Sequence, residues 1–100
     1  MKYGVKWSPE AKEEFSQILD YLESRFGNRA TIDFIEKVDI VIGHIAVNPK
    51  IFPASPKRPD IHRAIISKQT SLYYRLEKQE VQLLHFWDNR KDPDALRVDE

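Results

Sequence analysis

Residues 61–87, IHRAIISKQTSLYYRLEKQEVQLLHFW, decide the fold of this 100-residue chain. They contain three runs rich in β-branched, aromatic and aliphatic residues, at 61–67, 71–76 and 81–87. Only three and four residues separate the runs, and strands joined by connections this short pair in antiparallel fashion. The stretch therefore predicts a three-stranded antiparallel meander.

Side chains alternate across a strand, so the middle run has two faces. One face would hold Leu72, Tyr74 and Leu76, and the other Ser71, Tyr73 and Arg75. We expect the first face to pack and the second to be polar and exposed to solvent. The run 81–87 shows no clean alternation, because apolar residues occur at both its odd and its even positions. The sequence therefore does not decide which face of this strand packs in the core.

The N-terminal half predicts a strand followed by two helices. Residues 3–7 alternate in polarity as a half-buried strand does. Ser8, placed before a proline, is a typical helix start, and apolar residues then recur at helical spacing as far as Gly27, a candidate left-handed cap. Asn28 can cap a second helix, which should end near Asn48 because the next residue is a proline.

The expected fold class is α+β. An N-terminal strand, an antiparallel two-helix hairpin and the meander would form a sandwich, with the helices packed on one face of an antiparallel sheet. With 41% hydrophobic residues, a chain of this length forms one core, so we expect a single domain over residues 1–100. Residues 48–60 contain four of the six prolines and predict an extended surface crossing within that domain.

Composition excludes several classes of site. The chain has no cysteine, and its histidines, at positions 44, 62 and 85, lack the spacing of metal ligands on one helix, so we expect no metal and no cofactor. It has no apolar stretch of about eighteen residues that could span a membrane. The first seven residues lack the apolar block of a secretory signal, so we expect a cytoplasmic protein without a membrane partner.

Charge is unevenly distributed along the chain, although the net charge is zero. Residues 57–91 carry eight Lys and Arg against four Asp and Glu, an excess of +4, whereas both flanking segments are acidic. If this segment forms one surface, that surface suits an anionic partner. The alternative is scattered, solvated charge.

An ordered series of short motifs runs along almost the whole chain. It consists of WSPEA at 7–11, Tyr21, NP at 48–49, Arg63, YYR at 73–75 and FWDNRKDP at 86–93. In this order, and with this pattern of strands and helices, the chain resembles the RelE/ParE superfamily of toxins. The resemblance implies the toxin of a type II toxin–antitoxin module, a small bacterial protein held inactive by an antitoxin encoded beside it.

The resemblance leaves three hypotheses for the activity. RelE-like members cut mRNA in the ribosomal A site without metal, whereas ParE-like members poison DNA gyrase and do no chemistry themselves. We prefer the ParE-like hypothesis, because Ser71 stands where RelE-like nucleases carry an arginine and no tyrosine or histidine follows Arg90. The alternatives are a ribosome-dependent mRNA endonuclease and a degenerate, non-toxic member that only binds its antitoxin.

Each hypothesis has its own candidate residues. As a ParE-like toxin, the chain would contact its target through Arg63, Arg75 and Arg90. As a nuclease, it would use Arg63, His85 and Arg90, since metal-free RNA cleavage needs an acid, a base and cations around the phosphate. Alternatively, these arginines have a purely structural role. Arg63 and Arg75 would then pair across strands with the glutamates at 77 or 80, and Arg90 would form a turn salt bridge to the aspartates at 88 or 92.

Two further features have open interpretations. An unperturbed imidazole titrates near neutrality, so His85 could serve as an acid or base, or it could be a packed strand residue with one hydrogen bond. The second helix has an apolar arc wider than one packed face requires, and part of it is assigned to antitoxin binding. The residues assigned are Ile32, Ile40 and Val47.

Overall fold

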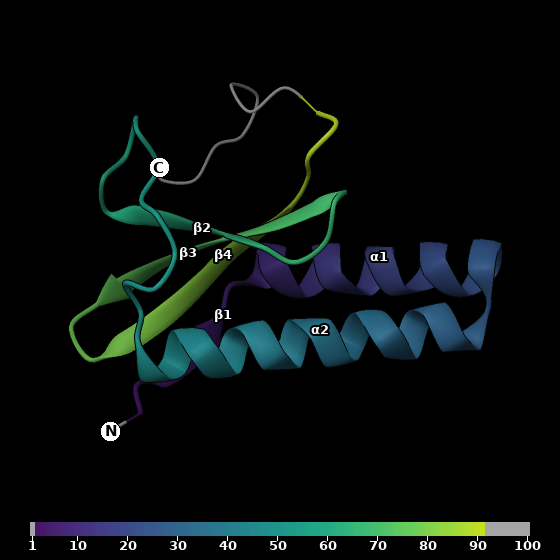
Figure 1. The fold of residues 1–100 in the computed structure, drawn as a ribbon, viewed down its shortest axis with the longest axis horizontal. Coiled ribbons are helices and arrows are strands. Elements are labelled where there is room, and N and C mark those ends of the chain that lie inside the picture. The colour runs from purple at the N-terminus through teal and green to yellow at the C-terminus, as the bar shows by residue number, and fades with distance from the viewer. Residues whose placement is uncertain (1, 92–100) are drawn as a thin grey trace.

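Two antiparallel helices lie against one face of a four-stranded sheet (Figure 1) in the computed structural model, which describes residues 2–91. The elements are β1 (Gly4–Trp7), α1 (Pro9–Phe26), α2 (Asn28–Val47), β2 (Ile61–Ile65), β3 (Thr70–Glu77) and β4 (Glu80–Asp88). Their order across the sheet is β1-β4-β3-β2. The predicted α+β class, helical hairpin and antiparallel meander are confirmed.

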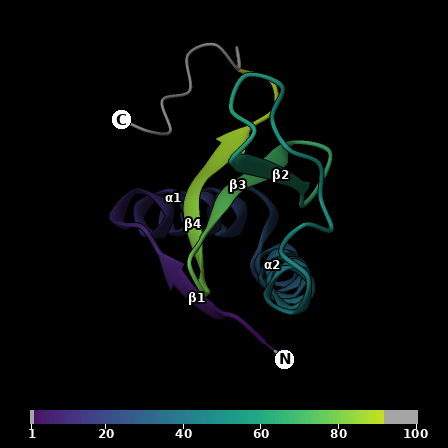
Figure 2. The same cartoon turned by 90° about the vertical axis from the view of Figure 1, so that its left-hand side faces the viewer.

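β1 forms an edge of the sheet beside β4 and runs parallel to it, from Gly4 opposite Glu80 to Trp7 opposite Leu83. The expectation of a wholly antiparallel sheet is therefore wrong for this strand. Short loops fix the direction of neighbouring strands only within the meander. The helical hairpin separates β1 from the meander in sequence and packs beside the sheet (Figure 2), and so long a connection permits a parallel pair.

Ser8 joins the start of α1 to the sheet. Its hydroxyl accepts a hydrogen bond from the Ala11 N–H (2.9 Å), as predicted for a helix cap, and donates one to the Leu84 carbonyl (2.8 Å). The Ser8 N–H donates to the Leu83 carbonyl (2.9 Å). The first turn of α1 is thereby held against the edge of β4, beyond the end of β1.

Gly27 forms the tight turn between the two helices. Its φ of +92° lies in the region that favours glycine, as the sequence predicted, and its N–H donates back into the last turn of α1. Its carbonyl accepts bonds from the N–H and the hydroxyl of Thr31. Gly27 therefore caps α2, and the predicted cap at Asn28 is wrong because Asn28 is already helical. The predicted end of the helix at Asn48 is confirmed.

A β-bulge at Leu84 explains the irregular pattern of β4. Tyr73 pairs with His85, but the next residue of β3 pairs with Leu83, so Leu84 has no residue opposite it. The extra residue reverses the alternation of side chains. Leu83 before the bulge and Phe86 after it therefore both lie in the core, which no regular strand would allow.

The core lies between the helices and the sheet. Its largest members from the sheet are Leu72, Tyr74, Val81, Leu83 and Phe86. The opposite face of β3 is not exposed as predicted, since Ser71 is 0% and Tyr73 8% exposed. Ser71 is covered because its hydroxyl lies in a network of polar side chains on that face.

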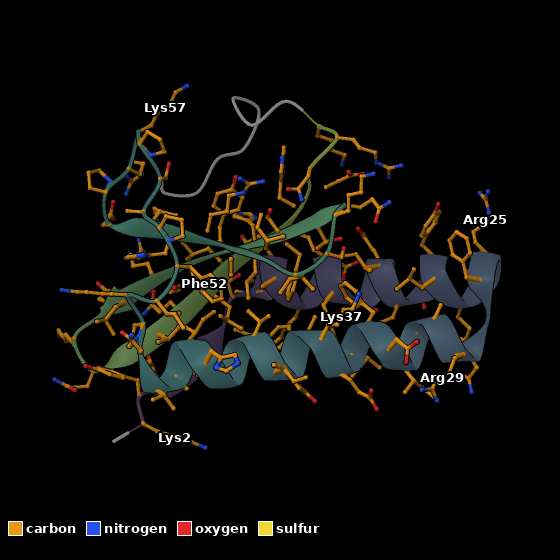
Figure 3. The ribbon with its side chains drawn as sticks, in the orientation of Figure 1. Lys2, Arg25, Arg29, Lys37, Phe52 and Lys57 are labelled. Carbon is orange, nitrogen blue, oxygen red and sulfur yellow. The ribbon has the colours of Figure 1, made fainter. Side chains whose placement is uncertain are left out.

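The proline-rich segment 48–60 lies along the outer edge of β2, to which backbone hydrogen bonds and an isolated β-bridge join it. Phe52, labelled in Figure 3, packs against the core from this segment. The buried Tyr74 hydroxyl donates to the Pro49 carbonyl (2.7 Å). The segment thus protects a sheet edge that would otherwise be open. Within residues 2–91, no helix is long and apolar enough to cross a membrane.

Candidate functional site

A hydrogen-bond network holds Arg63 on the sheet face away from the helices. Arg63 Nε donates to Ser71 Oγ (2.9 Å), and Arg63 Nη2 donates to Asn89 Oδ1 (3.1 Å). The Ser71 hydroxyl donates to the same Oδ1 (2.6 Å), and the Asn89 amide donates to the Lys68 carbonyl (3.2 Å). The network fixes β2, β3 and the turn after β4 to one another, and it places Arg63 beside the turn that carries the last candidate arginine.

Arg75 lies on the same sheet face, towards the other end of β3. It donates weakly to Gln82 Oε1 (3.5 Å), and its Nη1 lies 4.0 Å from an oxygen of Asp60. Its Nε is buried and has no hydrogen-bond partner within residues 2–91. The predicted pairing of both sheet arginines with Glu77 or Glu80 is wrong among the described residues. Arg63 bonds Ser71 and Asn89 instead, and Arg75 contacts Gln82 and Asp60.

Arg90 and Asp88 form a two-point ion pair in the turn after β4. Arg90 Nε lies 3.0 Å from Oδ1 and Nη2 lies 2.8 Å from Oδ2, while the Arg90 N–H donates to Oδ1 (2.9 Å). The bonds from Arg90 lower the pKa of Asp88 to about 2. The turn salt bridge predicted for Arg90 is therefore found, with Asp88 as its partner, whereas Asp92 lies outside the described residues. The Arg90 side chain remains 71% exposed.

His85 is tied to α1 by a carboxylate that the sequence analysis did not identify. Its Nδ1 lies 2.9 Å from Glu14 Oε2, and the other oxygen of Glu14 accepts the Phe86 N–H (2.9 Å). Glu14 therefore provides the hydrogen-bond acceptor for a backbone N–H of β4 at the part of the edge that β1 does not cover. No signal in the sequence distinguishes Glu14 from the other acidic residues of that helix, because its role depends on where the helix crosses the strand.

A groove of about 740 Å³ lies between α1 and the end of the sheet near the β2–β3 connection. Ile18 and Tyr21 of α1 and Trp87 of β4 contribute apolar surface to it, and Arg90 and Lys91 lie at its side. The Lys91 ammonium is 5.7 Å from the Trp87 ring centroid. The groove therefore combines aromatic surface with two cations from the positively charged segment.

Exposed apolar side chains lie on both helices. Ile32, Ile40 and Val47 are 39%, 61% and 57% exposed, on the face of α2 away from the core, so they are available to a partner. Phe26 is the last of the apolar residues that recur at helical spacing before Gly27, and this spacing predicts it to lie in the core, but it is 63% exposed. The helices extend past the sheet (Figure 1), so no strand covers their joined end. Figure 3 shows Arg25 and Arg29 at that end.

The three residues predicted for a nuclease have three separate sets of partners. Arg63 bonds to Ser71 and Asn89, while His85 and Arg90 each bond a carboxylate. Within residues 2–91, no group of three or more acidic or histidine side chains could hold a metal ion. Arg63, His85 and Arg90 therefore each have at least one side-chain partner among the described residues.

Known proteins resemble this chain in sequence pattern and in fold. Residues 5–93 match the family described as the ParE toxin of type II toxin-antitoxin system, parDE. No curated protein is significantly similar in sequence. The structure is similar to one titled "Chromosomal ParDE TA system from P. aeruginosa", with 15% identity over 87% of this chain and 96% of that chain, and a TM-score of 0.73.

Two further structures share the fold. A YoeB/ParE toxin from Agrobacterium tumefaciens has a TM-score of 0.64 and 11% identity, covering 85% of this chain and 96% of that chain. The E. coli DinJ–YafQ toxin–antitoxin complex has a TM-score of 0.61 and 9% identity, covering 90% of this chain and 96% of that chain. At such identities the likeness shows the fold alone, whereas the family match spans most of the sequence. The chain belongs to the ParE toxin family of type II toxin–antitoxin systems.

Proposed function

We propose that this toxin acts in the ParE manner, by binding DNA gyrase through surface arginines, and that it does no chemistry itself. The observation that carries the proposal is that the residues at the positions a nuclease would use are already buried or bonded to other side chains. Ser71, which stands where RelE-like nucleases carry an arginine, is fully buried, and its hydroxyl is shared between Arg63 and Asn89. Arg90 is exposed but already ion-paired with Asp88, so a phosphate would have to compete with that carboxylate.

The proposed target surface is the sheet face away from the helices together with the adjoining turn. Arg63 and Arg75 share that face, because Arg63 pairs with Tyr73 and side chains alternate along β3. Asn89 ties Arg63 to the turn that carries Arg90. Arg63 and Arg90 are exposed and held in place by fixed partners, so they lose little freedom when they bind a partner, which favours a recognition role.

We propose that the antitoxin docks in the groove between α1 and the sheet. A groove buries a partner's apolar side chains on more than one side, and Arg90 and Lys91 favour a segment that carries acidic residues. The outer face of α2, with Ile32, Ile40 and Val47, stays a predicted alternative for antitoxin contact. Toxin–antitoxin complexes are described for proteins of this fold, which supports an antitoxin partner here.

The test compares the three hypotheses with one set of proteins. The purified chain is added to gyrase with supercoiled plasmid and, separately, to translating ribosomes with a defined mRNA. We expect trapped gyrase–DNA cleavage products and intact mRNA. Arg63→Ala and Arg90→Ala should each weaken the gyrase effect at least tenfold. Arg29→Ala is the matched control, because that arginine is 81% exposed at the far end of the hairpin.

The other outcomes are equally specific. Cleavage of mRNA that disappears in Arg90→Ala and His85→Ala would establish the nuclease hypothesis and refute ours. No effect in either assay, combined with tight antitoxin binding, would identify the degenerate, non-toxic form.

A further inference from the structure

Arg75 differs from the other two candidate arginines in how few of its hydrogen-bond donors are used. Arg63 donates to neutral side chains at 2.9 and 3.1 Å, and Arg90 forms a two-point ion pair. Within the described part of the chain, the polar contacts of Arg75 are a weak hydrogen bond to Gln82 (3.5 Å) and an oxygen of Asp60 at 4.0 Å. Its buried Nε has no partner there. A guanidinium has five N–H donors, so most of those on Arg75 lack a strong acceptor.

Arg75 lies between buried side chains on the sheet face away from the helices. It pairs with Ile61 of β2, which is 1% exposed, and Tyr73, two residues earlier in β3, is 8% exposed. Directly paired residues, and residues two apart in one strand, share a face of the sheet. The Arg75 side chain is 27% exposed. The cation is therefore partly removed from water but still open to contact, and a charge in such a position attracts an anion more strongly than in bulk water.

Asp60 does not neutralise Arg75, because its carboxylate is bonded to Arg58. Arg58 Nε and Nη2 lie 3.2 and 3.1 Å from the two oxygens of Asp60, whereas the 4.0 Å to Arg75 is too long for a hydrogen bond. The side-chain bonds from Arg58 are the main cause that lowers the pKa of Asp60, and the charge of Arg75 is the weakest. Two cations and one carboxylate leave this cluster with a net charge of +1.

We propose that Arg75 is the anchor of the target surface and binds one carboxylate of the protein target, from an aspartate or glutamate side chain. The inference rests on the proposed function and names the chemical group that this surface recognises. A carboxylate matches the planar fork of a guanidinium and accepts two N–H bonds from it. One carboxylate also balances the net +1 of the cluster. A nucleic-acid backbone, with a charge on every phosphate, would instead be repelled by the exposed Asp60.

A bond at Arg75 should contribute more to affinity than a bond at either of the other two arginines. Arg63 and Arg90 must share or give up existing hydrogen bonds before they accept a new partner, so their net gain is smaller. Arg75 gives up only a 3.5 Å contact and gains charge-assisted bonds in a partly desolvated position. We therefore expect Arg75→Ala to weaken target binding by about thirtyfold or more.

Acetate is a probe that tests the site on the full chain without the target. The Nε–H signals of the arginines are followed by NMR while sodium acetate replaces sodium chloride at constant ionic strength. The Arg75 signal should shift along a saturating curve, whereas Arg63 and Arg90, whose Nε–H groups already donate, should respond less. Arg29, 81% exposed at the far end of the hairpin, reports the response of a surface arginine. Asp60→Asn removes the competing negative charge and should tighten acetate binding severalfold.

Purified gyrase, with and without DNA, then identifies the source of the carboxylate. Arg75→Ala should weaken binding to the same extent in both conditions. Arg75→Lys should not restore it, because an ammonium cannot form the two-point contact. Asp60→Asn should tighten binding, and Arg29→Ala, the matched control, should leave it unchanged. Arg75→Met removes a buried donor that has no partner, so the free energy of unfolding in urea should stay equal or rise.

Several results would overturn the proposal. These are an Arg75 signal that responds to acetate no more than that of Arg29, gyrase binding that survives Arg75→Ala, and a loss of stability in Arg75→Met, which would show a structural role. A loss of binding only when DNA is present would assign the partner to a phosphate and refute the carboxylate. The proposed function fails separately: acetate that binds at Arg75 in a chain that does not bind gyrase would support the site and refute gyrase as its target.

Discussion

Alanine in place of Gly43 should make the protein more stable. Alanine is more favourable than glycine in a helix interior by about 0.8–1.0 kcal/mol. The whole of this difference should appear here, because Gly43 is exposed and a Cβ there meets no atom within 4 Å. For a domain of this size, 1 kcal/mol corresponds to a rise in Tm of about 4–8 °C.

Gly27→Ala is the matched control, and it should have the opposite sign. A Cβ on Gly27 also meets nothing within 4 Å, so crowding plays no part at either position. Its backbone, however, has φ 92° and ψ −177°, a conformation that is essentially restricted to glycine. Forcing alanine into it costs about 1–3 kcal/mol. The same substitution is thus expected to stabilise at one site and destabilise at the other, for backbone reasons alone.

The assay is urea unfolding followed by far-UV circular dichroism, at a low micromolar concentration. The free energy of unfolding should rise for Gly43→Ala and fall for Gly27→Ala, with the dependence on urea unchanged. A loss of stability in Gly43→Ala would mean that the glycine serves the fold itself. That result would refute the conclusion that the Gly43 site is unstrained and open to solvent.

Four other outcomes are expected. Tyr74→Phe should lower the free energy of unfolding by about 1–2 kcal/mol in urea titrations, because the buried Pro49 carbonyl loses the hydroxyl that bonds it; an unchanged midpoint would mean that water replaces the bond. Burial raises the pKa of Tyr74 to about 12, so its ionisation in an absorbance titration should occur only as the protein unfolds in alkali. Arg90 lowers the pKa of Asp88 to about 2, below its unfolded value near 3.9, so this carboxylate stabilises the fold above about pH 4 and the contribution is lost as the pH falls through 2. The pair is largely exposed, so Asp88→Asn should cost only about 0.2–1 kcal/mol at pH 7 and nothing measurable at pH 2, and an equal cost at both pH values would contradict the assignment. Glu14→Gln should speed amide hydrogen exchange at the β4 edge, with the rest of the sheet as internal control; unchanged exchange would show that Glu14 does not hold that edge.

Much of the fold could be predicted because its signals are local. Strand runs with short connections gave the meander, the serine before Pro9 gave the helix start, and Gly27 gave the turn between the helices. The signals failed where distant segments meet. At the bulge the Leu84 carbonyl accepts a hydrogen bond from the distant Ser8, and the single inserted residue reverses every inward assignment after it.

The sequence predicted which residue types form the candidate site, but it did not predict their contacts. Arg63, Arg90 and His85 were recognised as groups able to bind or act, but their partners Asn89, Asp88 and Glu14 are contributed by other turns and helices or depend on turn geometry. Of these, the sequence offered only Asp88. The sequence did not predict which apolar side chains are exposed either, since Phe26 follows the apolar periodicity of its helix and is nevertheless exposed.

The sequence by itself determined the elements, their order and the family, because helix caps, alternation and turn residues act over a few positions. Only the tertiary structure decided the parallel placement of β1, the burial of Ser71 and the exposure of Phe26. Each of these depends on which surfaces meet across the chain. Local patterns restrict the available surfaces, but packing selects among them, because burial and hydrogen bonding are gained only when distant segments come together.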